Sequence, residues 1–174
     1  MKKNIVCVMV ALTLYTHLSD AHKCCVSSAI KETWPHEWLI SKKSVRHYIQ
    51  AHPPNWCQAI IDDGQLLGFF LVSWTDNNVT MSVPNTGVMT NATLWLKCLF
   101  VFPEVRRQRL GGTLIDAACE VARVHNAKRL DLFVLEKDQQ LIDYYKKKDF
   151  IYLGTNAIAE HHMSCFIQRC PGGS

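Results

Sequence analysis

The sequence lacks an apolar run long enough for a membrane-spanning helix. The longest such run, Ile5 to Leu14, covers about ten residues, whereas a transmembrane helix needs about twenty. An excess of charge is missing too, because 19 Lys and Arg residues are set against 15 Asp and Glu residues. A net charge of +4 suits a small anionic ligand better than nucleic acid, which requires a dense basic face. Since no repeat, low-complexity segment or linker divides the chain, we predict one domain over residues 1–174.

The eight cysteines include no Cys-x-x-Cys pair. A chain of 174 residues with 48% hydrophobic residues can bury a core without disulfide bonds. Cys57, Cys98 and Cys119 lie within apolar segments, where a reduced cysteine packs as a small hydrophobic residue. We therefore predict buried free thiols. His162 and Cys165 have no second ligand pair that would complete a tetrahedral metal site, so we expect no metal.

Two interpretations of the N-terminal segment remain open. Two lysines precede the apolar run from Ile5 to Leu14, and Ser19 to Ala21 resembles a cleavage site, which is typical of a signal peptide. Formal glycosylation sites at Asn78 and Asn91 would fit a secreted protein. The same run is rich in valine and bounded by polar residues, which favours the first buried strand of a domain.

Hydrophobic periodicity and turn residues predict a mixed α/β fold with alternating helices and strands. The Asp63-Gly64 pair between two apolar runs predicts a β-hairpin. The predicted helices cover residues 19–34, 41–51, 110–124 and 139–148. The predicted strands cover residues 5–14, 57–61, 66–74, 93–101, 130–135, 150–153 and 163–168, and residues 75–91 are predicted to be irregular.

The segment from Leu99 to Leu114 predicts an anion site. A buried strand leads into a turn with three arginines between residues 106 and 109, and an amphipathic helix follows. The first turn of a helix has unpaired N–H groups and the positive end of the dipole, and Gly111 and Gly112 would let a phosphate approach the backbone. The alternative is a glycine-softened helix start with a solvated basic face.

This segment resembles the signature of the acetyl-CoA-dependent N-acetyltransferases of the GNAT superfamily, and the resemblance extends over essentially the whole chain. The signature is Val-x-Pro, then Gln/Arg-x-x-Gly-x-Gly/Ala, then a helix with an early leucine. The matching residues are Val101, Pro103, Arg106, Gly111 and Leu114. Arg109 stands where the first glycine is expected. A second match, to Tyr-x-x-x-Gly-Phe, runs from Tyr145 to Phe150, with Asp149 in place of the glycine. Since that glycine usually serves a helix C-terminus in a left-handed conformation, we expect Asp149 to adopt it at a small cost.

The resemblance implies a central, mostly antiparallel sheet that splays between its fourth and fifth strands, with flanking helices. It favours the strand interpretation of the N-terminal run, because cleavage after Ala21 would remove the first strand and uncover a sheet edge. It also implies a cytoplasmic enzyme with acetyl-CoA as cosubstrate and an amine as acceptor, acting as a monomer or homodimer without nucleic acid, membrane or metal.

The resemblance further implies which residues bind acetyl-CoA. They are Leu99, Phe100, Val101, Arg106, Arg107, Gln108, Arg109, Leu110, Gly111, Gly112 and Thr113. Backbone groups of the strand would pair with the pantetheine arm, and a backbone N–H would stabilise the developing oxyanion. The hydroxyl of Tyr145 is the candidate acid for the departing thiolate, with Tyr144 as a second choice. Alternatively, Tyr145 is a core aromatic residue with its hydroxyl at the rim.

The resemblance assigns no general base to this chain. The stretch from Trp95 to Cys98, where family members often have a glutamate, contains no carboxylate. Glu136, His161 and His162 are candidates that would act through water, and each is also explained as a surface or packing residue. A neutral α-amine would need no dedicated base.

The candidate acceptor-binding residues are Trp34, Trp95 and His161. Such aromatic side chains could form an apolar slot for a peptide N-terminus or a flat cation, or could belong to the core. The stretch from Glu32 to Pro35 is similar to the actin-type N-terminal acetyltransferase branch, which favours a protein N-terminus as acceptor. Two other interpretations remain, namely a non-catalytic module that binds CoA or peptide and a secreted, disulfide-bonded domain.

Overall fold

The computed structural model describes residues 12–33, 49, 56–74, 93–158 and 161–169, with side chains described up to Thr155. The segments predicted as a helix over 41–51 and as irregular over 75–91 therefore lie outside the described residues. The exception is Ile49, which is helical and buried. Residues 1–11 of the N-terminal run and Trp34 lie outside as well.

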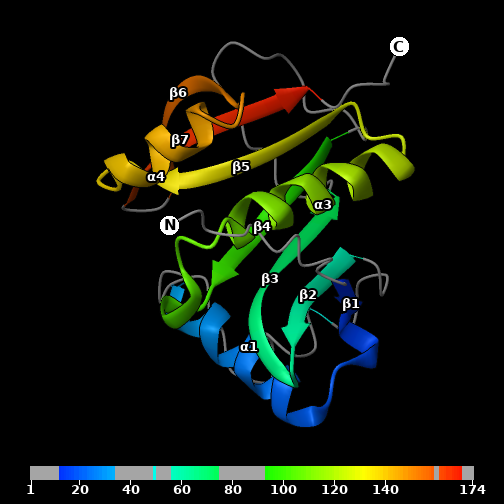
Figure 1. Ribbon diagram of the computed structural model, residues 1–174. Coiled ribbons are helices and arrows are strands. Elements are labelled where there is room, and N and C mark those ends of the chain that lie inside the picture. Colours follow the sequence, from blue (N-terminus) through cyan, green and yellow to red (C-terminus); the bar gives the residue numbers. More distant parts are fainter. Residues whose placement is uncertain (1–11, 34–48, 50–55, 75–92, 159–160, 170–174) are drawn as a thin grey trace, which may run out of the picture.

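Seven strands form one mixed sheet in the order β1-β2-β3-β4-β5-β7-β6 (Figure 1). The strands are β1 Leu12–Leu14, β2 Cys57–Asp62, β3 Gln65–Trp74, β4 Thr93–Val101, β5 Arg129–Leu135, β6 Ile151–Ile158 and β7 His161–Arg169. The helices that lie wholly within the described residues are α1 Asp20–Thr33, α3 Leu110–Val124 and α4 Gln139–Lys146, together with short 3-10 turns η1 Tyr15–His17 and η4 Pro103–Val105. β4 and β5 are parallel, and the other neighbours are antiparallel. The predicted mixed, mostly antiparallel sheet is confirmed.

The predicted bounds of β4 and α3 are those of the structure, whereas β6 and α4 differ from their predictions. β6 continues to Ile158, well beyond the predicted residue 153, because its pairing with β7 extends that far. α4 ends at Lys146 rather than at residue 148, because a left-handed turn follows it. The N-terminal run contributes Leu12–Leu14, which pairs with β2 at the edge of the sheet.

Local sequence signals account for the ends of several elements. The Ser19 hydroxyl accepts a hydrogen bond from the backbone N–H of His22 at 3.2 Å, as expected of the N-cap of α1. Asp63 and Gly64 have φ values of 46° and 73°, the left-handed pair that a tight hairpin turn requires. Asn126, with φ 56°, ends α3 in the same conformation, and the N–H of Ala127 returns to the Ala122 carbonyl at 2.8 Å.

The sheet carries one hydrophobic core on each face. α3 and α4 pack on one face, and their buried residues include Leu114, Ile115 and Ile142. α1 packs on the other face, where Val26 and Ile30 are fully buried. Each core removes apolar side chains from water, which is the main favourable contribution to folding. The two cores hold β4 between α3 and α1, so its position is defined from both sides.

Candidate active site

The sheet separates between β4 and β5. The two strands are paired from Thr93↔Arg129 to Leu96↔Leu132, and the pairing ends there. Beyond this point β4 continues alongside β3 as far as Val101, while β5 continues alongside β7 as far as Leu135. Figure 1 shows the two strands diverging toward their C-terminal ends. The splay predicted from the sequence is confirmed, and it lies next to the start of α3.

A β-bulge in β4 coincides with the end of this pairing. Leu71 of β3 pairs with Cys98, but the next residue, Val72, pairs with Leu96, so the register skips Lys97. The extra residue changes which side chains face α3, because strand side chains alternate between the two faces. Before the bulge, Leu94 and Leu96 belong to the core under α3, whereas Cys98 belongs to the core under α1.

The loop between β4 and α3 contains two arginines in a left-handed conformation. Arg107 and Arg109 both have φ 66°. Non-glycine residues adopt this conformation at a cost of about 1–2 kcal/mol. Arg109 occupies the position of the first signature glycine, a residue type that adopts this conformation without steric cost. Arg106, the first arginine of the loop, donates from Nε to the Val101 carbonyl at 3.1 Å, which ties the loop to the end of β4.

α3 begins without a side-chain cap. No side chain caps it at Arg109, and no acidic residue lies in its first turn. The residues from Arg106 to Arg109 are all exposed. Because the start of a helix carries partial positive charge, an exposed arginine loop there makes an electropositive surface that favours an anion. The predicted anion-binding residues are therefore brought together, except that the Leu110 side chain is buried in the core.

α4 packs directly against the first turn of α3. A Cβ atom added to Gly111 would lie 2.9 Å from the hydroxyl of Tyr144 and 4.0 Å from a methyl group of Val101. A Cβ atom added to Gly112 would lie 2.9 Å from Nζ of Lys148. The two glycines thus let a phenol and an ammonium group approach the start of α3. Sequence reasoning did not identify Lys148, although its spacing of four residues from Tyr144 places both on one side of the α4 terminus.

The end of α4 fixes the position of Tyr145. The N–H of Phe150 donates to the Tyr145 carbonyl at 3.2 Å, and the N–H of Asp149 donates to the Lys146 carbonyl at 3.2 Å. Asp149 has φ 62°, which completes a Schellman motif. The predicted left-handed conformation of Asp149 is confirmed. The rings of Tyr145 and Phe150, 5.3 Å apart, make the hydrophobic contact that accompanies such a motif.

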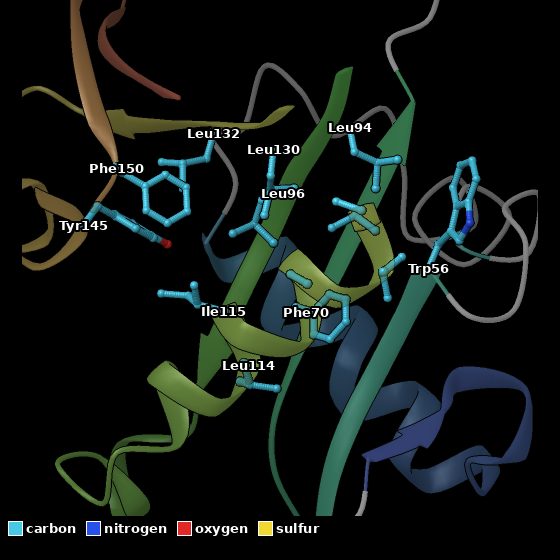
Figure 2. Packing of buried hydrophobic residues seen from close by; sticks show 14 of the residues in the cluster. Trp56, Phe70, Leu94, Leu96, Leu114, Ile115, Leu130, Leu132, Tyr145 and Phe150 are labelled. Carbon is cyan, nitrogen blue, oxygen red and sulfur yellow. The ribbon is translucent and has the colours of Figure 1, made fainter. Parts of the chain in front are cut away.

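The hydroxyl of Tyr145 points from α4 toward β4 (Figure 2). Its side chain is 5% exposed and belongs to the core under α3. Burial raises the pKa of Tyr145 above its ordinary value, and the nearby Tyr144 and Cys98 raise it further. The electrostatic interaction with Cys98 places the phenol near β4 just past the bulge. The phenol therefore stays protonated and can donate a hydrogen bond at the splay.

The other face of the sheet carries a polar group that sequence reasoning missed. Asp131 alternates along β5 with Leu130 and Leu132, which face α3, so its carboxylate lies on the opposite face. It is fully buried, and Nη2 of Arg129 lies 3.2 Å from its Oδ2. A single carboxylate within an apolar strand was the available signal.

The candidate acceptor-binding residues are not gathered by the described part of the structure. Trp95 is 2% exposed and stacks on Phe133 with ring centroids 4.6 Å apart. His161 begins β7, opposite Ile158 of β6. Trp34 lies outside the described residues. Glu136, a candidate base, is exposed in the turn after β5. The acceptor-binding role of these residues stays a prediction.

Three further observations concern the cysteines, the potential metal ligands and the length of the helices. The cysteines whose side chains are described are free, and Cys57 and Cys98 are buried as predicted, with burial raising the pKa of Cys57 above its ordinary value. The expectation of buried thiols was wrong for Cys24 and Cys25, which are exposed on α1, and Cys119 is half-buried. Among the described residues, no group of three or more potential metal ligands gathers. In the same part of the chain, none of the helices is long and apolar enough to cross a lipid bilayer.

Solved structures with this fold include acetyltransferases. The NatC complex bound to Gag peptide and CoA contains a chain with TM-score 0.69 and 11% identity, covering 92% of this chain and 98% of that chain. Ard1 from Thermoplasma volcanium has TM-score 0.67 and 16% identity, with coverage of 91% and 96%. YncA, a putative acetyltransferase from Salmonella typhimurium solved with acetyl-CoA, has TM-score 0.68 and 11% identity, with coverage of 95% and 96%. At these identities the likeness shows the fold alone.

Sequence comparison identifies the family. No curated protein matches the chain. A model of the acetyltransferase (GNAT) family matches residues 14–150, a range that begins in β1 and ends at the Phe150 of the second motif. The match therefore includes the splayed strands, the arginine loop and the Tyr145 helix. The resemblance inferred from two imperfect motifs is confirmed, and the chain belongs to the GNAT acetyltransferase family.

Proposed function

We propose that this chain is a cytoplasmic N-acetyltransferase that transfers the acetyl group of acetyl-CoA directly to a primary amine. Support comes from one observation above all. The splay between β4 and β5 opens beside the uncapped, arginine-rich start of α3, so a slot between strands and an anion site lie next to each other. A pantetheine thioester joined to a pyrophosphate requires those two features side by side.

The proposed binding uses the backbone at both ends of the cosubstrate. Leu99 to Val101 would pair with the pantetheine arm along the part of β4 that has left β5. The arginine loop and the first turn of α3 would hold the phosphates, and the thioester supplies an activated acetyl group at the splay. Arg106 supports this arrangement because its bond to the Val101 carbonyl sets the distance between the two subsites.

Tyr145 is the proposed donor to the leaving sulfur. A phenol with a raised pKa remains protonated at neutral pH, so it can donate a hydrogen bond to sulfur as negative charge develops there. Tyr144 is the less suitable donor, because its hydroxyl lies against Gly111 at the phosphate end. Tyr145 would thus lie at the thioester end of bound acetyl-CoA, and Tyr144 at its phosphate end.

A protein N-terminus is the proposed class of acceptor. An α-amine has an unperturbed pKa of about 8, against about 10.4 for lysine, so more of it is neutral and nucleophilic at physiological pH. The structural neighbour solved with a peptide and CoA, and the short sequence similarity at residues 32–35, favour the same class.

The proposal is tested with the full chain in two steps. Calorimetry with acetyl-CoA should give saturable binding, and thiol release should then appear with a degenerate peptide library carrying free α-amines and be weaker with spermidine. Tyr145→Phe should lower turnover about 100-fold with little change in acetyl-CoA affinity, whereas Tyr144→Phe serves as the matched control. A folded chain that binds no CoA would contradict the proposal, and binding without turnover would favour a non-catalytic module.

A further inference from the structure

Asp131 is a buried carboxylate whose polar atoms are left unsatisfied. Its side chain is fully buried, and neither oxygen has a hydrogen-bond partner. Arg129 approaches Oδ2 to 3.2 Å, which is close enough for an ion pair, but the alignment is not that of a hydrogen bond. The same guanidinium donates to the Thr93 hydroxyl at 3.2 Å. Buried carboxylates without hydrogen bonds are costly and rare, so this one requires an explanation.

The position of Asp131 relates it to the splay. Its register partner on β4 is Trp95, and the pairing of the two strands ends one residue later, at Leu96↔Leu132. Its side chain faces away from α3, whereas Tyr145 approaches β4 from the α3 face. A group held between the diverging strands would therefore have a phenol on one face of the sheet and a carboxylate on the other.

The charged groups around Asp131 can be named strand by strand. Arg129 precedes it on β5, and on β4 the ammonium of Lys97 lies 5.5 Å from the centre of the Trp95 ring. On β7 the residue paired with Asp131 is Ile167, and Arg169 is paired with Arg129. Burial raises the pKa of Asp131 from 3.8 to about 7, and Arg129 acts in the opposite direction. Both protonation states are therefore populated near neutral pH.

We propose that Asp131 accepts, through a bound water molecule, the proton that the acceptor ammonium must lose before it attacks the thioester. This inference rests on the proposed function and supplies the base that the sequence did not. The proton passes from nitrogen through water to the carboxylate, and the neutral amine then forms the N–C bond while the C–S bond breaks. The sulfur takes up the second proton of the nitrogen with the help of Tyr145, and Asp131 releases its proton to solvent.

The geometry favours Asp131 over the earlier candidates. Glu136 lies beyond the end of β5, where it is exposed to solvent, whereas Asp131 is fully buried. Asp131 lies on the strand that forms one wall of the splay. Because Asp131 and Tyr145 are on opposite faces of the sheet, the attacking amine loses its proton on the face of Asp131, while Tyr145 donates to the leaving sulfur from the α3 face.

The first experiment measures the pH dependence of kcat/KM with acetyl-CoA and the degenerate peptide library. Wild type should show an acidic limb that rises with unit slope through about pH 7. Asp131→Asn should lower kcat/KM about 100-fold at pH 7 and move the acidic limb to about pH 8, where its rate follows only the fraction of free α-amine. Asp143→Asn, an equal loss of charge on the surface of α4, is the matched control and should keep both the rate and the limb.

A second variant separates a catalytic proton acceptor from a structural ion pair. Arg129 lowers the pKa of Asp131, so Arg129→Gln should move the acidic limb to higher pH. Infrared difference spectra of the unliganded chain should show a protonated carboxyl appearing as the pH falls through about 7 in wild type, and not in Asp131→Asn. A limb that stays at about pH 7 in Asp131→Asn, or a carboxyl that titrates near pH 4, would overturn the proposal.

Failure of this inference is distinguishable from failure of the proposed function. Asp131 is placed away from the arginine loop, so Asp131→Asn should bind acetyl-CoA with wild-type affinity in calorimetry. A wild-type chain that binds no acetyl-CoA would contradict the proposed function. An Asp131→Asn variant that binds acetyl-CoA and retains wild-type turnover would overturn the assignment of Asp131 alone.

Discussion

The starts of α3 and α4 differ in whether a side chain of the protein accepts hydrogen bonds from the first N–H groups. Asp138 caps α4, where its Oδ1 accepts from the N–H of Leu141 at 3.1 Å. α3 begins at Arg109 with φ 66°, with no side-chain cap and with arginines around it. A capped helix start stabilises the fold, whereas an uncapped, electropositive start is suited to an anion from outside the chain. The difference is what the proposed function requires, with stabilisation of the fold at the start of α4 and anion binding at the start of α3.

Among the variants that compare the two helix starts, the largest change should be the loss of acetyl-CoA affinity on neutralising the arginine loop. Arg107→Gln combined with Arg109→Gln should weaken acetyl-CoA binding about tenfold, or ~1.4 kcal/mol, because two cations near a helix N-terminus are lost. The matched control is Lys137→Gln with Lys147→Gln, which removes the same charge around α4. Calorimetry at low salt compares the acetyl-CoA affinities of the two double variants. An equal loss of affinity in both would show that the start of α3 is no more important for binding than the surface around α4.

Removal of the α4 cap should have the opposite signature. Asp138→Ala should lower the free energy of unfolding by about 1 kcal/mol, because the N–H of Leu141 loses its side-chain acceptor. Acetyl-CoA affinity should stay unchanged. Asp138→Ser, which keeps an acceptor at the cap, should retain most of the stability in urea unfolding. A large loss of affinity in Asp138→Ala would mean that α4 takes part in binding.

Relief of backbone strain should distinguish the two left-handed motif positions. Arg109→Gly should raise the free energy of unfolding by about 0.5–1 kcal/mol, since the steric cost of a left-handed arginine exceeds the entropy that glycine adds to the unfolded chain. Asp149→Gly should change it by only a few tenths, because aspartate tolerates this conformation better than arginine does. Urea unfolding of both variants measures the difference, and equal gains would show that residue type is unimportant at these positions.

The smallest effect concerns Lys148, whose ammonium lies over the first turn of α3. Lys148→Gln should weaken acetyl-CoA binding about twofold to threefold, or ~0.5 kcal/mol, and stabilise the unliganded chain slightly, since a cation beside a helix N-terminus is unfavourable without an anion. Both changes should vanish at high salt. Lys147→Gln, on the same turn, should alter neither the affinity nor the stability. If Lys147→Gln changes them and Lys148→Gln does not, the contact with α3 belongs to Lys147.

The sequence predicted β4, α3 and the turn after α4 well because their signals are local. The period of apolar residues defined β4 and α3, and the register of Tyr145 with Phe150 placed the phenol. Asp149 was expected to be left-handed from a motif position alone, and it is. Each of these features depends on residues within a few positions of one another.

The features that were missed depend on pairing between strands. Unbroken alternation in β4 would place Leu96 and Cys98 on one face, and only the register with β3 reveals the bulge between them. The burial of Asp131 depends likewise on neighbours that are distant in sequence. The stacking of Trp95 on Phe133 likewise could be known only from the parallel pairing of β4 with β5.

The bulge at Lys97 also bears on how this strand can change over evolution. Leu99 and Val101 face α3 because the alternation of side chains resumes after the extra residue. Substitution at this exposed position alters one side chain, and deletion would leave Leu96 and Cys98 adjacent and regularly paired with Val72 and Leu71, so the later side chains would keep their faces. β4 should therefore accept both substitution and deletion of Lys97 without turning the rest of the strand over.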